Sequence, residues 1–145
     1  MRYLCGLLLV IVSICSNAMS FNQASVIFER LSKASNTNLY LALDPDESVN
    51  AHQSAHGVYL NKGMLRFVRN EDEMAMVLGH EIGHYVLGHW TSTPKNEYAS
   101  DVFGARLVSK AGYNRCKGVL VILRFHDGDS STHPASNKRY NRIKC

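Results

Sequence analysis

Residues 70–87, NEDEMAMVLGHEIGHYVL, predict one long helix with two histidines on its surface, around which the rest of the domain can pack. Asn70 is a good capping residue, and Glu73 lies where its side chain can reach back to that cap. The acidic first turn suits the positive end of the helix dipole, and Gly88 supplies the left-handed residue that commonly ends a helix. The sequence therefore predicts a helix from Asn70 to about Leu87.

The middle of this helix, His80-Glu81-Ile82-Gly83-His84, has the HExxH pattern. Residues four apart differ by only about 40° around a helix axis, so His80 and His84 project from one face and can share a metal ion. Glu81 lies beside them on the same surface, where it can take a proton from a water molecule at the metal. The pattern predicts a catalytic zinc site on this helix.

A catalytic zinc site has three protein ligands and an open position for water, so the two histidines need one more donor. His89 lies nine residues after His80, which is about 180° away around a regular helix. The longer pattern HExxHxxGxxH also fails, because Leu87 and Trp90 stand where it has glycine and histidine. We assign His89 a structural or capping role near the end of the helix.

The third ligand that we predict is Glu97, on a second helix that begins at Thr93-Pro94 and runs to Lys110. Asp101 follows one turn later on the same face, where it can accept the free ring N–H of a ligand histidine. An ordinary solvated acidic face is the alternative for either carboxylate alone. The HExxH helix just before them favours the metal site.

The remaining patterns predict an α+β fold that is mainly helical. Amphipathic spacing indicates a helix over 23–35, and two more helices are expected over 115–125 and 135–143. Apolar runs at 38–43, 49–53 and 57–60, separated by turn residues, predict a small, largely antiparallel sheet. The 145 residues, 46% of them apolar, suit one domain. Lys and Arg are scattered despite the net charge of +4, so nucleic acid is not an expected partner.

Residues 1–18 have the features of a signal peptide, with Arg2, an apolar run over 4–14 and small residues before a cleavage after Ala18. The run is shorter than the roughly 20 apolar residues that a stable membrane span needs. We therefore expect export to the periplasm or the extracellular space, with 19–145 as a single catalytic domain that carries the expected zinc site. Retention of the segment as a membrane anchor and lipid modification of Cys15 are the alternatives.

Removal of the signal leaves Cys116 and Cys145 as the cysteines of the mature chain, in an oxidising compartment. Two such cysteines favour one disulfide, which would restrict the unfolded chain and stabilise the fold by about 3 kcal/mol. Two unpaired thiols, or a bridge to another chain, are the alternatives.

HExxH followed by a glutamate-bearing helix resembles the gluzincin metallopeptidases, and a narrower set of matches resembles the family of HtpX and the CaaX prenyl endopeptidase. The matches cover most of the chain from Asn38 onward and comprise Asn50-Ala51, residues 77–84, Glu97 with Asp101, Ala111-Gly112-Tyr113, and Thr132-His133-Pro134 with Arg139. The resemblance implies a zincin-like domain with one Zn²⁺ that hydrolyses peptide bonds inside protein or peptide substrates, including misfolded or unfolded envelope proteins. The chain lacks the internal membrane segments of the embedded members and looks like their soluble, exported branch.

The resemblance also implies roles for residues outside the metal motif. It places His133 and Arg139 near the site, where either can donate a hydrogen bond to the developing oxyanion. His133 is alternatively a resting-state ligand at the open coordination position. Asn50 and Ala51 are placed on an edge strand to which an extended substrate adds as another strand.

A zinc-stabilised binding module or chaperone with the same fold is the competing function. Glu81 argues against it, because a structural zinc site closes with four protein ligands and has no use for an adjacent carboxylate.

Overall fold

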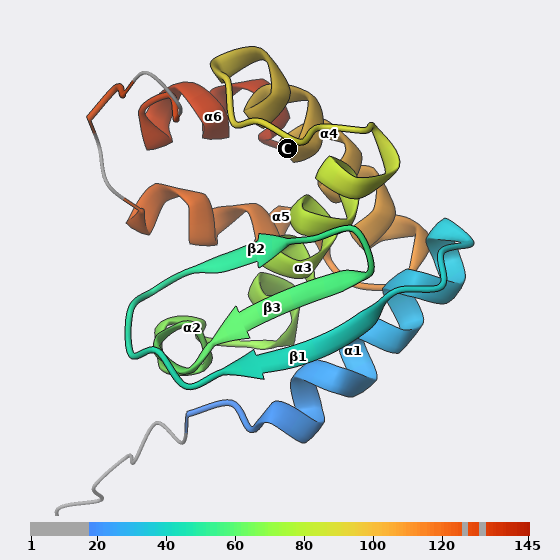
Figure 1. The fold of residues 1–145 in the computed structure, drawn as a ribbon. Coiled ribbons are helices and arrows are strands. Elements are labelled where there is room, and N and C mark those ends of the chain that lie inside the picture. Colours follow the sequence, from blue (N-terminus) through green and yellow to red (C-terminus); the bar gives the residue numbers. More distant parts are fainter. Residues whose placement is uncertain (1–17, 126–127, 131–132) are drawn as a thin grey trace, which may run out of the picture.

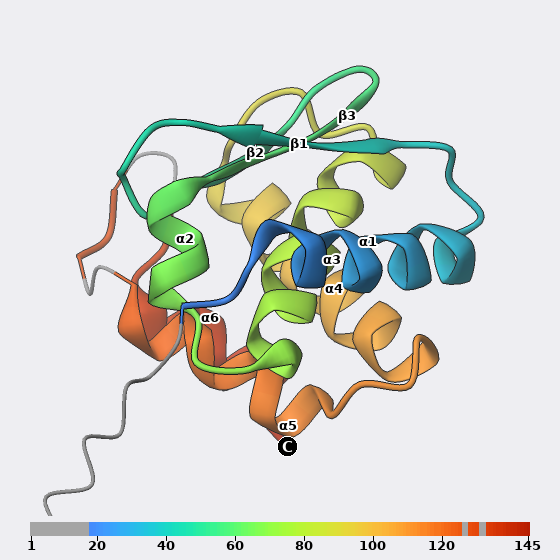
Figure 2. The ribbon, with the colours of Figure 1, turned by 90° about the horizontal axis from the view of Figure 1, so that it is seen from below.

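The chain folds into a group of helices with a small sheet on one side of them (Figures 1 and 2). The computed structural model describes residues 18–125, 128–130 and 133–145. The helices are α1 (Phe21–Ser35), α2 (Lys62–Phe67), α3 (Glu71–Val86), α4 (Pro94–Lys110), α5 (Arg115–Gly118), the 3₁₀ helix η1 (Val119–Arg124) and α6 (Ser136–Ile143). The strands are β1 (Tyr40–Asp44), β2 (Ala51–Gln53) and β3 (Gly57–Asn61). The mainly helical α+β fold is confirmed.

Some predicted segments differ from the structure or lie beyond what it describes. The helix expected over 115–125 is divided into α5 and η1, and α2 is a helix that the sequence patterns do not predict, because Asn61-Lys62-Gly63 is typical of a turn. The predicted signal peptide, apart from Ala18, and Cys15 lie outside the described residues. None of the helices in the described ranges is long and apolar enough to span a bilayer.

The sheet is mixed, with the strand order β1-β3-β2, so the prediction of a largely antiparallel sheet was wrong. β2 and β3 form an antiparallel hairpin with His52 opposite Tyr59, but the longer pairing, of β1 with β3, is parallel. β3 takes the centre because its Val58 and Leu60 are completely buried, whereas β1 and β2 are partly exposed. β1 and β3, which are separated in sequence by β2, therefore become neighbours that run in the same direction. β2 is left as an edge strand beside α3.

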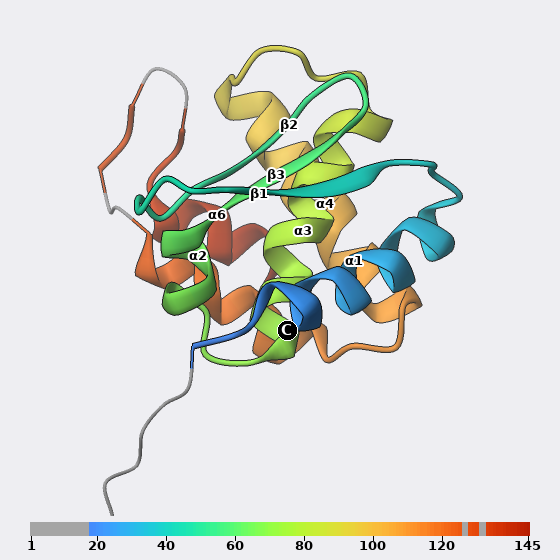
Figure 3. The same ribbon diagram turned by 60° about the horizontal axis from the view of Figure 1, so that its bottom comes forward.

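The helix α3, which carries the HExxH motif, lies beneath the sheet, and α1 and α4 both pack against α3 (Figure 3). Its N-terminus is capped as expected, because the Asn70 side chain accepts a hydrogen bond of 3.0 Å from the Glu73 N–H. Glu73 does not reach back to Asn70; its buried carboxylate instead accepts from the Arg69 N–H and pairs with Arg124. A buried carboxylate requires such a charged partner. Gly88, with a φ of 68°, ends the helix region as predicted.

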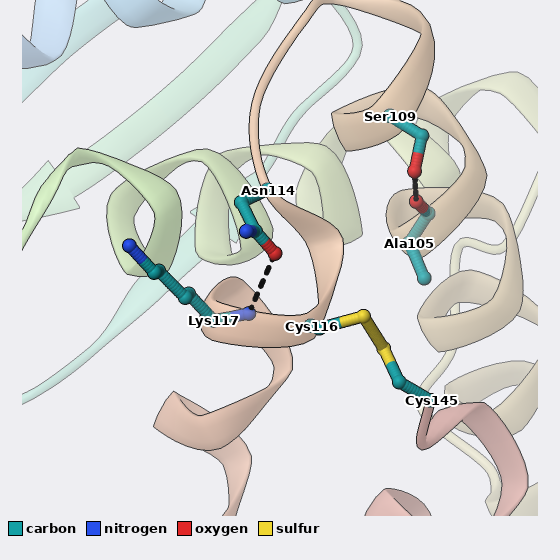
Figure 4. Close-up of a disulfide and its surroundings, with 6 residues drawn as sticks. All are labelled: Ala105, Ser109, Asn114, Cys116, Lys117 and Cys145. Atoms are coloured by element: carbon teal, nitrogen blue, oxygen red, sulfur yellow. Dashed lines mark hydrogen bonds between the residues drawn. A yellow bond between two sulfur atoms is a disulfide. The ribbon is translucent and has the colours of Figure 1, made fainter.

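A disulfide joins Cys116 of α5 to Cys145, which follows α6 (Figure 4). The two Cα atoms are 5.6 Å apart, and the cysteines are separated by 29 positions in the sequence. This is the pair of cysteines that removal of the signal peptide would leave in the mature chain. The bond ties the C-terminus, and with it the end of α6, to the helices packed against α3.

We expect the double variant Cys116→Ser/Cys145→Ser to lose about 2–4 kcal/mol of unfolding free energy, because the unfolded chain is no longer restricted by the cross-link. Urea unfolding followed by circular dichroism measures the change. The reduced, unmodified protein should unfold at the same urea concentration as the variant. Equal unfolding midpoints for the oxidised and reduced protein would contradict a stabilising disulfide.

Candidate metal centre

Three side chains from two helices converge on one point, namely His80 and His84 of α3 and Glu97 of α4. Their metal-binding atoms all lie within 4.8 Å of one another. The Nε2 atoms of the two histidines are 3.0 Å apart, and the nearest Glu97 carboxylate oxygens are 3.4 Å from His80 and 3.3 Å from His84. The structure thus brings together the three residues that the sequence nominates as ligands.

The ligand atoms of this cluster that lack a hydrogen bond are arranged to bind a cation. Nδ1 of His80 lies 2.9 Å from the Asp101 carboxylate, and donation there leaves the lone pair of a neutral ring on Nε2, facing His84 and Glu97. The Oε2 atom of Glu97 is buried, and within the described part of the chain it has no hydrogen-bond partner. Burying such an oxygen is costly, and a cation between the three side chains would relieve that cost. Two imidazoles and one carboxylate are a donor set of catalytic zinc sites.

The charges around the cluster favour a positive charge at its centre. Burial alone would lower the pKa of His80, but its hydrogen bond with the Asp101 carboxylate and the nearby Glu97 carboxylate raise that pKa to about 10. Burial alone would raise the pKa of Glu97, but the close approach of His80 and His84 to its carboxylate holds that pKa well below its usual range. A proton on His80 and a metal cation therefore compete for the same place, so metal affinity is expected to fall as the pH falls.

Glu81 lies next to the ligands on α3 without being one of them. Its partly buried side chain lines the same cleft as His80 and Glu97. Burial raises the pKa of Glu81, and the neighbouring His80 and His84 only partly oppose that effect. A carboxylate with a raised pKa is better matched to accepting a proton near neutral pH and returning it.

Glycines at the contact between α3 and α4 allow the ligands to meet. A Cβ atom added at Gly104 would lie 2.9 Å from the backbone nitrogen of His80, and one added at Gly83 would lie 3.1 Å from the carbonyl oxygen of Ser100. Side chains at these positions would force the helices apart and carry Glu97 away from the histidines. No sequence prediction covered this contact, although Gly79 and Gly83, four residues apart on one helix face, are a signal for close helix packing.

Comparison with known proteins supports a peptidase centre. The model described as Peptidase family M48 matches residues 18–94, which is just over half of the chain and includes the whole HExxH motif. The chain belongs to peptidase family M48. A search of curated proteins found no match. Membership of M48 implies a metal-dependent peptidase. The matched residues end before Glu97, so the family match does not cover that residue, and its place in the cluster comes from the structure.

In this M48 protein, Asp101 and Arg139 hold the ring of His80 from behind. Asp101 is completely buried and accepts from His80 and from both Nε and Nη2 of Arg139, at 2.9 and 2.7 Å. Burial alone would raise the pKa of Asp101, but Arg139 and His80 lower it below its usual value. Asp101 is therefore ionised and able to fix the tautomer of His80. Two donors of Arg139 are engaged in this buried pair, which favours a positioning role over oxyanion binding.

We expect Arg139→Leu to weaken metal binding by about 10- to 100-fold, because Asp101 would no longer be held against His80. The metal affinity of Arg139→Lys should lie between those of the unmodified protein and Arg139→Leu, since lysine keeps the charge but not the two-pronged contact. Competition with a chromophoric chelator measures the affinity. Arg142→Leu, on the exposed side of the same helix, is the matched control. Equal affinities in Arg139→Leu and Arg142→Leu would contradict the positioning role.

The cleft extends from the metal cluster in two directions along β2. One arm has a volume of about 400 Å³, and the other, beside Gln53 and Trp90, has a volume of about 310 Å³. Asn50 and Ala51 line both arms. Ala51 is the first residue of the edge strand β2. The carbonyl oxygen of Asn50 accepts a hydrogen bond of 3.1 Å from the Asn61 N–H. The two residues expected at a substrate-binding edge therefore lie at the cleft.

Two further histidines lie near the cluster in different ways. His133 lines both arms of the cleft, its Nε2 is 3.8 Å from Glu97 Oε2, and its side chain is 58% exposed. His89 lies just beyond the end of α3, where its N–H donates to the His84 carbonyl and its ring contacts Ser100. His133 can reach a group bound at the cluster, whereas His89 has the contacts of a structural residue.

Proposed function

We propose that this M48 protein is a zinc-dependent endopeptidase in which His80, His84 and Glu97 hold one Zn²⁺ and Glu81 is the general base. The proposal is carried by one observation: the His-His-Glu cluster lies with Glu81 in an open cleft beside the edge strand β2. A binding module would need the metal ligands but would have no use for Glu81 in the cleft.

Zinc, when bound, supplies a Lewis acid that makes a water molecule more acidic and polarises the scissile carbonyl. Glu81 takes the proton from the attacking water and passes it to the leaving amine. Asp101 and Arg139 keep the His80 ring in place throughout. His133, exposed at the cleft, donates a hydrogen bond to the oxyanion that develops on the substrate.

The substrates that we propose are extended, unfolded segments of proteins. β2 has one edge that is not paired with β3, and a peptide that adds there forms backbone hydrogen bonds that tolerate many sequences. The cleft continues on both sides of the cluster, which supports cleavage inside a chain rather than removal of a terminal residue. The resemblance to HtpX and the CaaX prenyl endopeptidase supports internal cleavage of misfolded envelope proteins by this protein once it has been exported.

The test compares the purified protein before and after removal of its metal by a chelator, with unfolded casein as substrate. We expect one zinc per chain, loss of cleavage on chelation, recovery on addition of zinc, and internal casein fragments by mass spectrometry. Undiminished cleavage in chelator would remove the metal from the mechanism. Stoichiometric zinc binding without cleavage of any unfolded protein would favour the binding module.

A further inference from the structure

The two carboxylate oxygens of Glu97 have different surroundings. Oε1 accepts a hydrogen bond of 2.6 Å from the hydroxyl of Ser92, a half-buried residue of the loop between α3 and α4. Oε2 is buried, and among the residues that the structure describes it has no hydrogen-bond partner. It lies 3.4 Å from Nε2 of His80, inside the ligand cluster. One oxygen is therefore held by the protein, and the other is left for the metal.

The histidines do not choose between the two oxygens of Glu97. Oε1 lies 3.3 Å from Nε2 of His84, and Oε2 lies 3.4 Å from Nε2 of His80. The last torsion angle of a glutamate side chain has no sharp preference, so a carboxylate in this place can turn and present either oxygen or both. The Ser92 hydroxyl removes that freedom, because it carries one hydrogen and donates it to Oε1.

The loop that carries Ser92 is anchored on both sides of this residue. On one side, Nε2 of Gln53, the last residue of β2, donates to the His89 carbonyl oxygen at 2.7 Å. On the other side, the Thr93 hydroxyl accepts a hydrogen bond of 3.2 Å from the Asn96 N–H and so fixes the start of α4. The Ser92 hydroxyl lies between these two anchors, so its position relative to α4 is set before any metal binds.

We propose that Ser92 is a positioning residue of the metal centre, which turns the Glu97 carboxylate so that Oε2 is the single oxygen offered to the metal, and that Gln53 holds the Ser92 loop in place. The inference rests on the proposed zinc site and names how its third ligand is presented. Two imidazoles and one carboxylate oxygen leave a fourth position open for water. A carboxylate that bound through both oxygens would occupy that position, so Ser92 keeps the site fit for hydrolysis.

Zinc affinity gives the first part of the test, by competition with a chromophoric chelator. Ser92→Ala should bind zinc about 10-fold more weakly, because an outer group that orients a ligand has been removed. Ser92→Thr keeps the hydroxyl and should bind zinc as tightly as the unmodified protein. Gln53→Ala should show a smaller loss than Ser92→Ala, since the loop keeps its anchor at Thr93.

Ser109→Ala is the matched control for Ser92→Ala. Ser109 is an exposed serine of α4 whose hydroxyl donates to the Ala105 carbonyl oxygen at 3.4 Å, away from the metal ligands (Figure 4). The same substitution there removes a hydroxyl without touching Glu97. Its zinc affinity should equal that of the unmodified protein.

The visible absorption of the Co²⁺-loaded protein gives the second part, because four-coordinate cobalt absorbs much more strongly than cobalt with five or six ligands. The unmodified protein, Ser92→Thr and Ser109→Ala should share one strong spectrum. In Ser92→Ala the carboxylate is free to bind through both oxygens, so the absorption should fall. A role of Ser92 in folding alone would lower the unfolding temperature of the metal-free variant and leave the cobalt spectrum unchanged, which would contradict the inference.

The outcomes separate this inference from the proposed function. Equal zinc affinities and identical cobalt spectra in Ser92→Ala and Ser109→Ala would overturn the positioning role and leave the metal site standing. If Ser92→Ala does not fold, Gln53→Ala decides, because an affinity and a spectrum equal to those of the unmodified protein would reject the anchored loop. Metal binding that depends on Ser92 without any cleavage of casein would reject the peptidase and keep the positioning role. Absence of metal binding by the unmodified protein would reject both.

Discussion

Glu81→Gln is expected to lower the rate of casein cleavage by about 10²- to 10⁴-fold while one zinc remains bound per chain. Glutamine has nearly the same shape as glutamate, but it cannot take a proton from water or return one to the leaving amine. The metal ligands are untouched, so the zinc content of the variant should equal that of the unmodified protein. Steady-state kinetics and metal analysis of the same preparations measure the two quantities.

Glu71→Gln is the matched control for this variant, because Glu71 is exposed on the first turn of the same helix, α3. It should retain both zinc and activity. If Glu81→Gln cleaves casein as fast as Glu71→Gln does, then Glu81 is not the base. Loss of zinc in Glu81→Gln would instead show that Glu81 is needed to keep the metal in place.

Glu97→Ala is expected to weaken zinc binding by more than about 100-fold and to abolish cleavage at micromolar zinc, since loss of a direct ligand costs more than loss of a supporting residue. The same change removes the stabilisation that zinc gives to the folded state. At zinc concentrations about 100 times the dissociation constant, that stabilisation is about 2.7 kcal/mol. Thermal unfolding with and without zinc therefore reports the site independently of catalysis.

Glu29→Ala, on the exposed side of α1, is the control for this experiment. It should show the same zinc-dependent rise in unfolding temperature as the unmodified protein. Circular dichroism of Glu97→Ala without zinc checks the fold, because Ser92 loses a hydrogen bond of 2.6 Å to Glu97. A zinc-dependent rise of normal size in Glu97→Ala would mean that another group completes the metal shell.

Local signals were enough to predict the motif helix and the helix that follows it. The caps of α3 and α4 at Asn70 and Thr93 depend on hydrogen bonds between residues three apart, which sequence spacing reveals directly. The positions of His80 and His84 on one helix face follow from the helical repeat. Fold class could be predicted for the same reason, because hydrophobic periodicity is a property of each segment on its own.

The order of the strands and the support of the ligands could not be predicted from local signals. Whether β1 pairs with β2 or with β3 depends on which strand is most completely buried, and that is a property of the whole sheet. The two-pronged contact of Arg139 with Asp101 joins residues 38 positions apart. No spacing rule relates those two residues, because they come into contact only when α6 packs on α4.

Local sequence patterns predicted the long helices α1, α3 and α4, the two histidines on one face of α3, and Glu97 as the third donor. Tertiary packing brings Glu97 to those histidines, places Asp101 and Arg139 beside the His80 ring, and forms the cleft along β2. The two sets of features differ in the sequence range over which the interactions act. Helix periodicity and capping act within a few residues, whereas the approach of α3 to α4 depends on Gly83 and Gly104, which leave room only when two distant segments pack together.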